Sequence, residues 1–241
     1  MTIRHGLIIP CGNFLFRYRN FLFPLVVLAI AVSTTPGTAV PGFIATPGGI
    51  LIILAGQAVR AAVIGLDYIK RGGMDKKVAA DTLVVTGIFA HCRNPLYTGN
   101  LLILCGLLIV YDNLWALLAG GLFFFLAYTA IVMTEENYLA AKFGNEYTEY
   151  CARAPRWSLR VQGLREALSG GRFNWRRVIN KDYTAMTTWI ITLVLLLAYR
   201  EMQQRGAGSY TAVWMTATLT ISAVLGLTYL IKRLKKSGWL A

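Results

Sequence analysis

The 241 residues are 56% hydrophobic and only 15% charged. Soluble domains have about 45–50% apolar and about 25% charged residues, so the composition excludes an ordinary soluble protein and predicts a membrane-embedded one. A net charge of +13 would suit a nucleic-acid-binding protein, but the basic residues stand in blocks between apolar runs. That arrangement fits anionic lipid headgroups and membrane orientation better than nucleic acid.

Apolar runs along the chain predict about six transmembrane helices. A helix needs about 20 residues to cross the hydrocarbon core of a bilayer. The expected spans are 20–40, 48–69, 96–111, 114–133, 183–199 and 210–231. We therefore predict an all-α, polytopic integral membrane protein.

The basic residues predict how these spans are oriented. With the N-terminus inside, every Lys and Arg lies in a cytoplasmic segment except Arg60, within a span, and Arg200 and Arg205, in an external loop. Cytoplasmic loops of membrane proteins carry the excess of Lys and Arg. Both termini are therefore expected to be cytoplasmic.

Two polar segments flank the third and fourth spans, residues 81–97 before them and 134–150 after them. Residues 111–113 alone join the two spans, and so short a connection forces an antiparallel hairpin. The polar segments must then reach the same, cytoplasmic side. We expect them to meet there and to enclose a ligand.

The first polar segment has the features of an anion site. Gly87 can adopt backbone angles that other residues avoid. Pro95 suits the first turn of the third span, where its missing N–H costs nothing, and Asn94 precedes it at the capping position. The free N–H groups of such a helix start favour a carboxylate, and Arg93 adds a bidentate positive charge.

Other side chains of the two segments suit a cationic ligand. Phe89 and Tyr97 offer aromatic faces, which attract onium cations. Glu135 and Glu136 end an apolar span, where carboxylates are costly without partners such as a ligand amino group or ribose hydroxyls. A ligand with an amino-acid head, a sulfonium and a ribose meets these needs, and S-adenosylmethionine is such a ligand.

The motif RNPLYTG, followed further along by EENYLAAKFGNEYTEY and then APR, resembles the isoprenylcysteine carboxyl methyltransferase and phospholipid methyltransferase superfamily. The matching positions, within residues 48–156, are Gly87, Phe89, Arg93, Pro95, Tyr97, Gly99, Glu135, Glu136, Leu139, Phe143, Gly144, Tyr147, Tyr150, Pro155 and Arg156. The resemblance implies a membrane methyltransferase that takes S-adenosylmethionine from the cytoplasm and a lipid substrate from the bilayer.

The resemblance also implies which residues hold the methyl donor. They are Asp81, Thr82, Leu83, Val84, Phe89, Asn94, Pro95, Leu96, Tyr97 and Glu135, and the local arguments above add Gly87 and Arg93. Two positions depart from the family pattern. Asn94 replaces the usual His, and Ile131 stands where the carboxyl methyltransferases have an Arg thought to meet the substrate carboxylate. The acceptor stays open between an isoprenylcysteine-like carboxylate, a phospholipid amine and another small lipid.

Two residues are predicted to act in catalysis. Glu136 is the candidate base for an amine acceptor. Arg60 lies inside a span, where a charge is expected to be functional. It either neutralises Asp67, seven positions along the same helix face, or faces the phosphate or carboxylate of a lipid. The histidines His5 and His91 and the four cysteines form no zinc or haem pattern, so no metal is expected.

The chain divides into three expected regions. Residues 1–156 form the methyltransferase core, with the cofactor site at 81–99 and 134–156, and residues 157–182 form a basic amphipathic segment on anionic lipid. Residues 183–241 form a helix pair without a charged interior, which is expected to serve packing or homo-oligomerisation.

Two other functions compete with methyl transfer. A membrane-embedded, nicotinamide-dependent sterol-type reductase would share the Pro-x-Tyr-x-Gly hairpin, but the Glu-Glu run of this chain speaks against it. A non-catalytic transporter or scaffold is the second alternative. Transporters tend to have internal repeats and broken helices, and the sequence has no such repeat.

Overall fold

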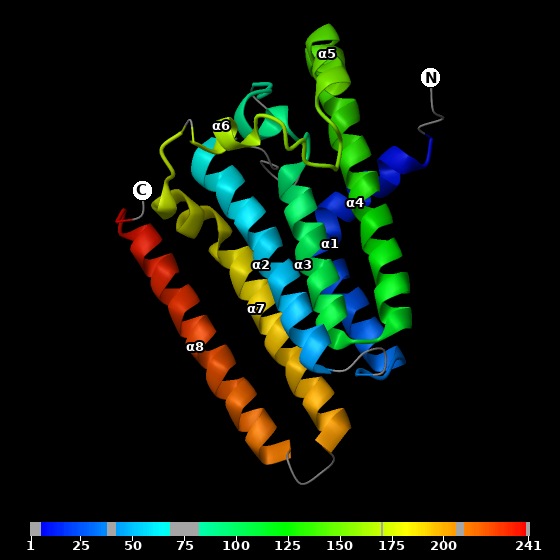
Figure 1. Ribbon diagram of the computed structural model, residues 1–241, viewed down its shortest axis with the longest axis vertical. Coiled ribbons are helices and arrows are strands. Elements are labelled where there is room, and N and C mark those ends of the chain that lie inside the picture. The colour runs from blue at the N-terminus through cyan, green and yellow to red at the C-terminus, as the bar shows by residue number, and fades with distance from the viewer. Residues whose placement is uncertain (1–5, 38–41, 68–81, 170, 206–209, 240–241) are drawn as a thin grey trace.

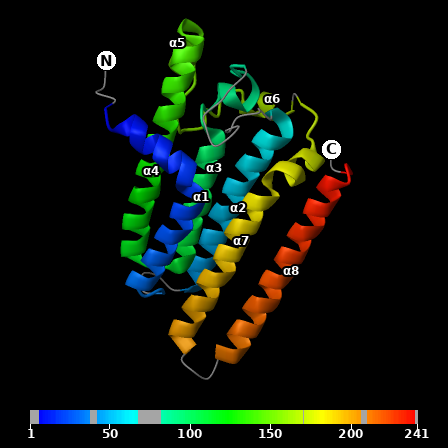
Figure 2. The same cartoon turned by 180° about the vertical axis from the view of Figure 1, so that it is seen from behind.

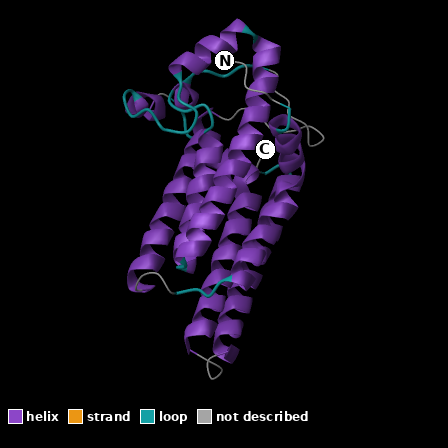
Figure 3. Cartoon of the chain, turned by 90° about the vertical axis from the view of Figure 1, so that its right-hand side faces the viewer, coloured by secondary structure: helices purple, strands orange, loops and turns teal. Residues whose placement is uncertain are grey.

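The computed structural model describes residues 6–37, 42–67, 82–169, 171–205 and 210–239 (Figure 1). Over these ranges the chain forms helices, turns and loops, and the described part contains no β-strand (Figure 3). The long helices run side by side as a bundle, and most of the loop structure gathers at one end (Figures 1 and 3).

The long helices are α1 (Ile8–Ser33), α2 (Gly42–Asp67), α3 (Pro95–Tyr111), α4 (Leu114–Phe143), α7 (Trp175–Arg205) and α8 (Tyr210–Lys236). Shorter elements are the 3-10 helix η2 (Gly87–Ala90), α5 (Asn145–Arg153) and α6 (Leu164–Ser169). Five helices, α1, α2, α4, α7 and α8, are long and apolar enough to cross a membrane, and α3 is a shorter apolar helix of 17 residues. The predicted all-α polytopic membrane fold is confirmed.

The first span starts earlier than expected. α1 begins at Ile8, not near residue 20, and ends at Ser33. Arg17 and Arg19 therefore lie inside the helix. Arginine permits this because it buries its methylene stem along apolar groups while its charged head reaches a polar partner or the membrane surface.

α7 also differs from expectation. It begins at Trp175, so the end of the expected interfacial segment belongs to a continuous helix. Arg200, expected in an external loop, lies inside α7 and is only 5% exposed, and Asp182 is fully buried. The prediction that the C-terminal pair has no charged interior was therefore wrong. Each of these charges is buried because an oppositely charged residue outside α7 pairs with it.

α2 and α3 approach each other closely along two pairs of glycines. A Cβ added at Gly99 would lie 2.8 Å from the Gly56 carbonyl oxygen, and one at Gly106 would lie 2.6 Å from the Gly49 carbonyl oxygen. Small residues allow membrane helices such close backbone contact. The same approach places the side chain of Arg60 on α2 directly against Gly99 on α3.

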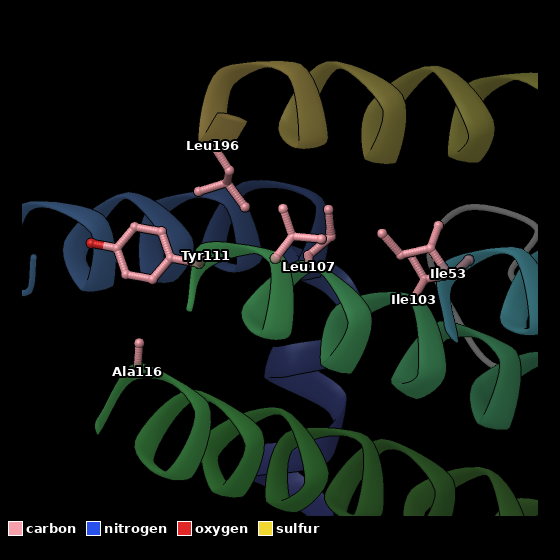
Figure 4. Close-up of a cluster of buried hydrophobic side chains, with 7 residues drawn as sticks. Ile53, Ile103, Leu107, Tyr111, Ala116 and Leu196 are labelled. Atoms are coloured by element: carbon pink, nitrogen blue, oxygen red, sulfur yellow. The ribbon is translucent and has the colours of Figure 1, made fainter. Parts of the chain in front are cut away.

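A cluster of buried side chains joins α7 to the other helices (Figure 4). Ile53 of α2, Ile103 and Leu107 of α3, and Leu196 of α7 belong to this cluster. In a bilayer such contacts stabilise by van der Waals packing, since lipid tails are as apolar as leucine. α7 is thus part of the bundle core, whereas α8 packs on α7 and Ala217 is the one buried residue among those described in α8.

The turn between α3 and α4 sets the position of the site. α3 ends at Tyr111, Asp112 has a left-handed φ of 61°, and the Asn113 side chain accepts a hydrogen bond from the Ala116 amide at 2.9 Å. The two helices form the predicted antiparallel hairpin. The start of α3 and the end of α4 therefore lie at the same end of the bundle, with the start of α1 and the end of α8 (Figures 1 and 2).

Candidate active site

The two polar segments meet at the start of α3. The Tyr97 hydroxyl donates a hydrogen bond to Glu135 Oε1 at 2.7 Å, which links α3 directly to α4. One residue further along α4, Glu136 Oε1 lies 3.5 Å from Asn94 Nδ2. The predicted meeting of the two segments is confirmed by these contacts. α4 runs on to Phe143 and so carries both carboxylates in its interior, not at its end.

A backbone pairing fastens the loop before α3 to the chain after α5. The Arg93 amide donates to the Pro155 carbonyl oxygen, and the Arg160 amide donates to the His91 carbonyl oxygen, both at 2.9 Å. His91 Nδ1 also lies 2.8 Å from the Arg160 carbonyl oxygen. Residues 155–160 therefore form a fixed wall beside the start of α3.

Cys92 lies buried inside this pairing. Its Sγ is 3.6 Å from the Trp157 carbonyl oxygen, and the residue has no exposed surface. Burial raises the pKa of the Cys92 thiol. Because the thiolate is the reactive form, Cys92 is a packing residue and not a nucleophile at neutral pH.

Glu136 is the centre of a positively charged cluster. Arg156 binds it through two nitrogens, with Nε at 3.1 Å and Nη2 at 2.7 Å from Oε2. Arg93 Nη2 lies 3.5 Å from Oε1 of the same carboxylate. The hydrogen bonds to Glu136 raise the pKa of Arg156. One carboxylate thus faces two guanidinium groups, and guanidinium groups suit an anionic ligand group.

The start of α3 lies beside this cluster. Asn94 occupies the capping position and Pro95 the first helical position, as predicted, but the Asn94 side chain does not cap the helix. Its Nδ2 instead donates to the Arg156 carbonyl oxygen at 3.3 Å. Asn94 therefore ties the wall to α3 and leaves the first-turn N–H groups to other acceptors. Helix starts of this kind favour anions.

The loop that leads into η2 divides its side chains between two clusters. Leu83 and Val85 pack with the buried aromatic residues of α5, and Val84 packs with Phe89. Alternate residues of an extended segment point in opposite directions, which explains this division. Gly87 then takes a left-handed φ of 58° at the start of η2, as expected.

Phe89 and Leu96 belong to the buried cluster that rests on α2. Phe89 is only 2% exposed, and its carbonyl oxygen accepts a hydrogen bond from the Tyr150 hydroxyl at 2.8 Å. Its ring packs against the protein interior and fixes the loop. Thr82 is exposed, and Asp81 lies outside the described residues.

Arg60 is charge-balanced by a residue far away in the sequence. Its guanidinium forms an ion pair with Asp182 of α7 and donates to Asn100 Oδ1 of α3. Gln57 Nε2 donates to Asp182 Oδ2 at 2.7 Å, and Trp189 Nε1 donates to Gln57 Oε1 at 2.9 Å. The partner is therefore on another helix. The side chain of Asp67, the partner considered from the sequence, lies outside the described residues.

α1 brings a further arginine to Tyr97. Arg19 Nη1 donates to the Tyr97 hydroxyl at 3.2 Å, and its guanidinium lies 4.7 Å from the centre of the Phe16 ring. The ring of Tyr128, on α4, lies 5.4 Å from that of Tyr97. Ile131 is fully buried in the same cluster, so the position with the family's Arg holds apolar packing here.

The structure brings together most of the predicted site and adds residues that the sequence did not assign. Those additions are Arg19, Asn100 and Asp182. An Asp at the start of an apolar run indicates that a partner for its charge lies inside the protein. Asp182 stands in such a position, so the sequence could have indicated its role. Arg19 has no such signal, because only the tilt and packing of α1 decide that it faces inward.

Comparison with known proteins finds a matching family and similar relatives. Residues 45–146, which run from α2 into α5, match the phospholipid methyltransferase family. The cobalt-zinc-cadmium resistance protein CzcN of Cupriavidus metallidurans is 32% identical over 151 residues, which cover 62% of this chain and 68% of that protein. The chain belongs to the phospholipid methyltransferase family.

This family is part of the superfamily that the RNPLYTG and EENYLAAKFGNEYTEY motifs predicted, so that prediction is confirmed. A second relative, the nickel-cobalt-cadmium resistance protein NccN of Alcaligenes xylosoxydans xylosoxydans, is 26% identical over 164 residues, covering 65% of this chain and 71% of that protein. No solved structure matches the chain.

The family match covers the hairpin but not all of the site. Gly87, Asn94, Tyr97 and both glutamates lie within residues 45–146. Arg19 precedes that range, and the 155–160 wall and α7 follow it. The phospholipid methyltransferase core is therefore completed here by contacts from both sides of the matched region.

Proposed function

We propose that this chain is an S-adenosylmethionine-dependent methyltransferase that modifies a lipophilic acceptor at the cytoplasmic face of a membrane. The hydrogen bond between Tyr97 and Glu135 carries the proposal, because it joins the two family motifs into one site. The excess of Lys and Arg in the segments at the site end supports the cytoplasmic orientation.

The residues present fit the carboxylate and the cationic groups of the methyl donor. The guanidinium groups of Arg93 and Arg156, with one carboxylate between them, suit the donor carboxylate beside the start of α3. The Tyr97 ring and Glu135 suit a cation, since aromatic faces and carboxylates both attract onium groups. Thr82, Leu83 and Val84 form the loop that would complete the site.

The bound donor supplies a methyl group that is electrophilic because it sits on a sulfonium. The protein's part is to orient and to exclude water. Correct placement of two reactants is worth about 7–11 kcal/mol in favourable cases. The wall at residues 155–160, fixed by backbone hydrogen bonds to residues 91–93, holds one side of the site in place. Closed surroundings strengthen the attraction between Glu135 and a cation.

Glu136 and Arg60 receive positioning roles in this proposal. To act as a base for an amine acceptor, Glu136 would have to release Arg156, which binds it at 2.7 Å. We therefore propose that it holds Arg93 and Arg156 in place. Arg60, balanced by Asp182, fixes α3 through its contacts with Gly99 and Asn100.

The binding of S-adenosylmethionine, which carries the sulfonium, to detergent-solubilised protein tests the donor site. Tyr97→Ala and Glu135→Ala should each weaken binding by about tenfold or more, which corresponds to about 1.4 kcal/mol. Glu146→Ala is the matched control, because Glu146 is an exposed carboxylate on α5. Unchanged affinity in both site variants would show that the donor does not bind here.

Two further measurements separate the alternatives. Membranes that contain the protein, incubated with methyl-labelled donor, should yield a labelled lipid whose identity names the acceptor. Binding of a reduced nicotinamide cofactor, with no binding of S-adenosylhomocysteine, would instead establish a sterol-type reductase. Absence of any labelled product from membranes with active donor binding would favour the non-catalytic alternative.

The two relatives suggest a cellular role. Both are named for resistance to divalent metals, and we propose that methylation by this chain contributes to such tolerance. A deletion strain complemented with wild-type protein or with Glu135→Gln should differ in growth on cobalt, zinc and cadmium. Equal growth of the two strains would remove this part of the proposal.

A further inference from the structure

Basic side chains gather where α7 begins and α8 ends, at the same end of the bundle as the candidate active site (Figure 1). They belong to the loop before α7, to its first turn and to the end of α8, and they are Arg172, Arg176, Arg177, Lys232, Arg233, Lys235 and Lys236. None of them forms an ion pair with a carboxylate in the described part of the chain. We call this set the α7–α8 basic end.

The segments that carry the basic end supply little negative charge. α8 contains no Asp or Glu, and Asp182 is the only acidic residue of α7 before Glu201. Asp182 is fully buried and already paired with Arg60. Among residues 157–174 the one acidic residue is Glu166, on α6. The α7–α8 basic end therefore has a net positive charge that these segments do not neutralise.

Two of these cations are held across the contact between α7 and α8. The Arg176 guanidinium lies 5.3 Å from the centre of the Trp239 ring. Lys235 Nζ lies 5.6 Å from the centre of the Tyr183 ring and donates to the Asn180 carbonyl oxygen at 3.3 Å. Residues 176, 180 and 183 have the spacing of one helix face. Basic residues are common at a cytoplasmic membrane surface, but these two are fixed in place along one line between two helices.

The turn after α8 places Trp239 beside α7. Gly238 has a left-handed φ of 79°, and its amide donates to the Lys235 carbonyl oxygen at 3.3 Å. The Trp239 amide donates to the Leu234 carbonyl oxygen at 3.2 Å. This is the Schellman arrangement, which commonly ends a helix at a glycine. The ring that it positions stabilises the Arg176 cation without neutralising it, so the guanidinium can still bind an anion.

The surroundings of the basic end fit the surface of a bilayer. One to two turns before it, α8 has Leu227 and Leu230 more than half exposed, and such side chains face lipid tails in a membrane. Trp175 and Trp239 are also largely exposed, and Trp is enriched at the level of lipid headgroups. A phospholipid whose tails lie along α8 therefore brings its phosphate to the basic end.

We propose that the α7–α8 basic end binds the phosphate of an anionic phospholipid, with Arg176 and Lys235 as its direct ligands. This inference does not depend on the proposed methyltransferase activity. The two free oxygens of a phosphodiester can accept from a guanidinium and from an ammonium at the same time. A cationic headgroup such as choline would meet repulsion from the other basic side chains, so headgroups with net negative charge are selected.

The bound lipid would fasten α8 to the bundle. Ala217 is the one buried residue among those described in α8, and the contacts of α8 are with α7. A hydrogen bond between the hydroxyl oxygens of Thr187 and Thr228, 2.6 Å apart, links the two helices further from the basic end. A phosphate shared by Arg176 and Lys235 adds a second link at the membrane surface.

Lipid titration of the full chain in detergent, followed by native mass spectrometry, tests the proposal. The first phosphatidylglycerol should bind about tenfold more tightly than zwitterionic phosphatidylcholine. Arg176→Gln/Lys235→Gln should abolish this preference. Lys142→Gln/Arg153→Gln is the matched control, because it removes the same charge from exposed positions on α4 and α5, and it should keep the preference. Phosphatidylglycerol should also raise the unfolding temperature of wild type and control but not of the α7–α8 variant.

The opposite outcomes would overturn the inference. Equal preference in wild type and Arg176→Gln/Lys235→Gln would show that these side chains do not bind the lipid. Equal losses in the two double variants would show that net charge alone attracts it. Displacement of phosphatidylglycerol by inorganic phosphate would show a site for free phosphate instead of a lipid. If the double variant does not fold, Arg176→Gln, at an exposed position, replaces it and should lower the preference by about threefold or more.

Discussion

Buried charges hold both ends of the bundle together, but they are arranged differently at the two ends. At the end away from the site, Arg200 Nη2 lies 3.2 Å from Asp112 Oδ2 and Nη1 donates to the Val110 carbonyl oxygen at 2.9 Å. The two side chains are 6% and 1% exposed. Charge is balanced there, and the pair is closed to its surroundings.

Backbone acceptors complete that far end. The Tyr111 hydroxyl donates to the Thr34 carbonyl oxygen at 2.6 Å, and Asn113 Nδ2 donates to the Thr35 carbonyl oxygen at 2.9 Å. These bonds tie the α3–α4 turn to the chain that follows α1. Because backbone groups have defined positions, these bonds hold the α3–α4 turn in place at this end of the bundle.

The site end contains one closed ion pair and one carboxylate shared by two arginines. Arg60 and Asp182 form a closed pair there, but Glu136 faces two arginines, and Arg156 is 38% exposed. Asp182 and Arg200 are 18 residues apart on α7, about 27 Å, which is close to the thickness of a hydrocarbon core. The difference indicates that ion pairs fix α7 near both membrane surfaces, and that among the described residues the site end has a carboxylate shared by two arginines.

The largest expected effect comes from breaking the far pair. Arg200→Leu leaves Asp112 buried without its ion-pair partner, which should lower the free energy of unfolding by about 3–5 kcal/mol. The double variant Arg200→Leu/Asp112→Leu should recover part of the loss. Thermal unfolding in detergent measures both, and S-adenosylhomocysteine affinity of the folded fraction should be unchanged. If Arg200→Leu were as stable as wild type, the Arg200–Asp112 pair would not stabilise this end of the bundle.

A smaller loss is expected at the second balanced pair. Arg60→Leu should lower the free energy of unfolding by about 2–3 kcal/mol, since Gln57 still donates to Asp182. Arg60→Leu/Asp182→Leu should regain stability and donor affinity, because the pair is neutral as a unit. Methyl transfer by membranes is the deciding readout. Recovery of stability without recovery of turnover would mean that Arg60 contacts the acceptor and does more than position α3.

The smallest expected change tests the cluster of Arg93, Arg156 and Glu136. Arg156→Met removes one of two positive charges beside Glu136, so S-adenosylhomocysteine affinity should fall by about tenfold, or about 1.4 kcal/mol. Stability should change by less than about 1 kcal/mol because Arg156 is partly exposed. Arg153→Met is the matched control, since Arg153 bonds only the carbonyl of its own helix turn among the described contacts. Equal affinity in the two variants would contradict a donor carboxylate at this cluster.

Local sequence features determined the helical membrane fold, the hairpin and the pairing of the two motifs. Runs of apolar residues are long enough to span a bilayer. The short turn at residues 111–113 makes the two helices that it joins antiparallel. In an antiparallel hairpin, Tyr97 near the start of α3 and Glu135 near the end of α4 lie at the same end of the bundle. The positions of Gly87, Asn94 and Pro95 follow from backbone rules of the same local kind.

Only the tertiary structure decided which charges pair across helices. Arg60 meets Asp182 across 122 residues, Arg200 meets Asp112 across 88, and Arg19 reaches Tyr97 from α1. Hydropathy and residue spacing show which face of its own helix a residue occupies. They do not show how the neighbouring helix is rotated about its axis, and so which of its residues meet that face. That rotation depends on close packing, such as the glycine contacts between α2 and α3, which many residues determine together.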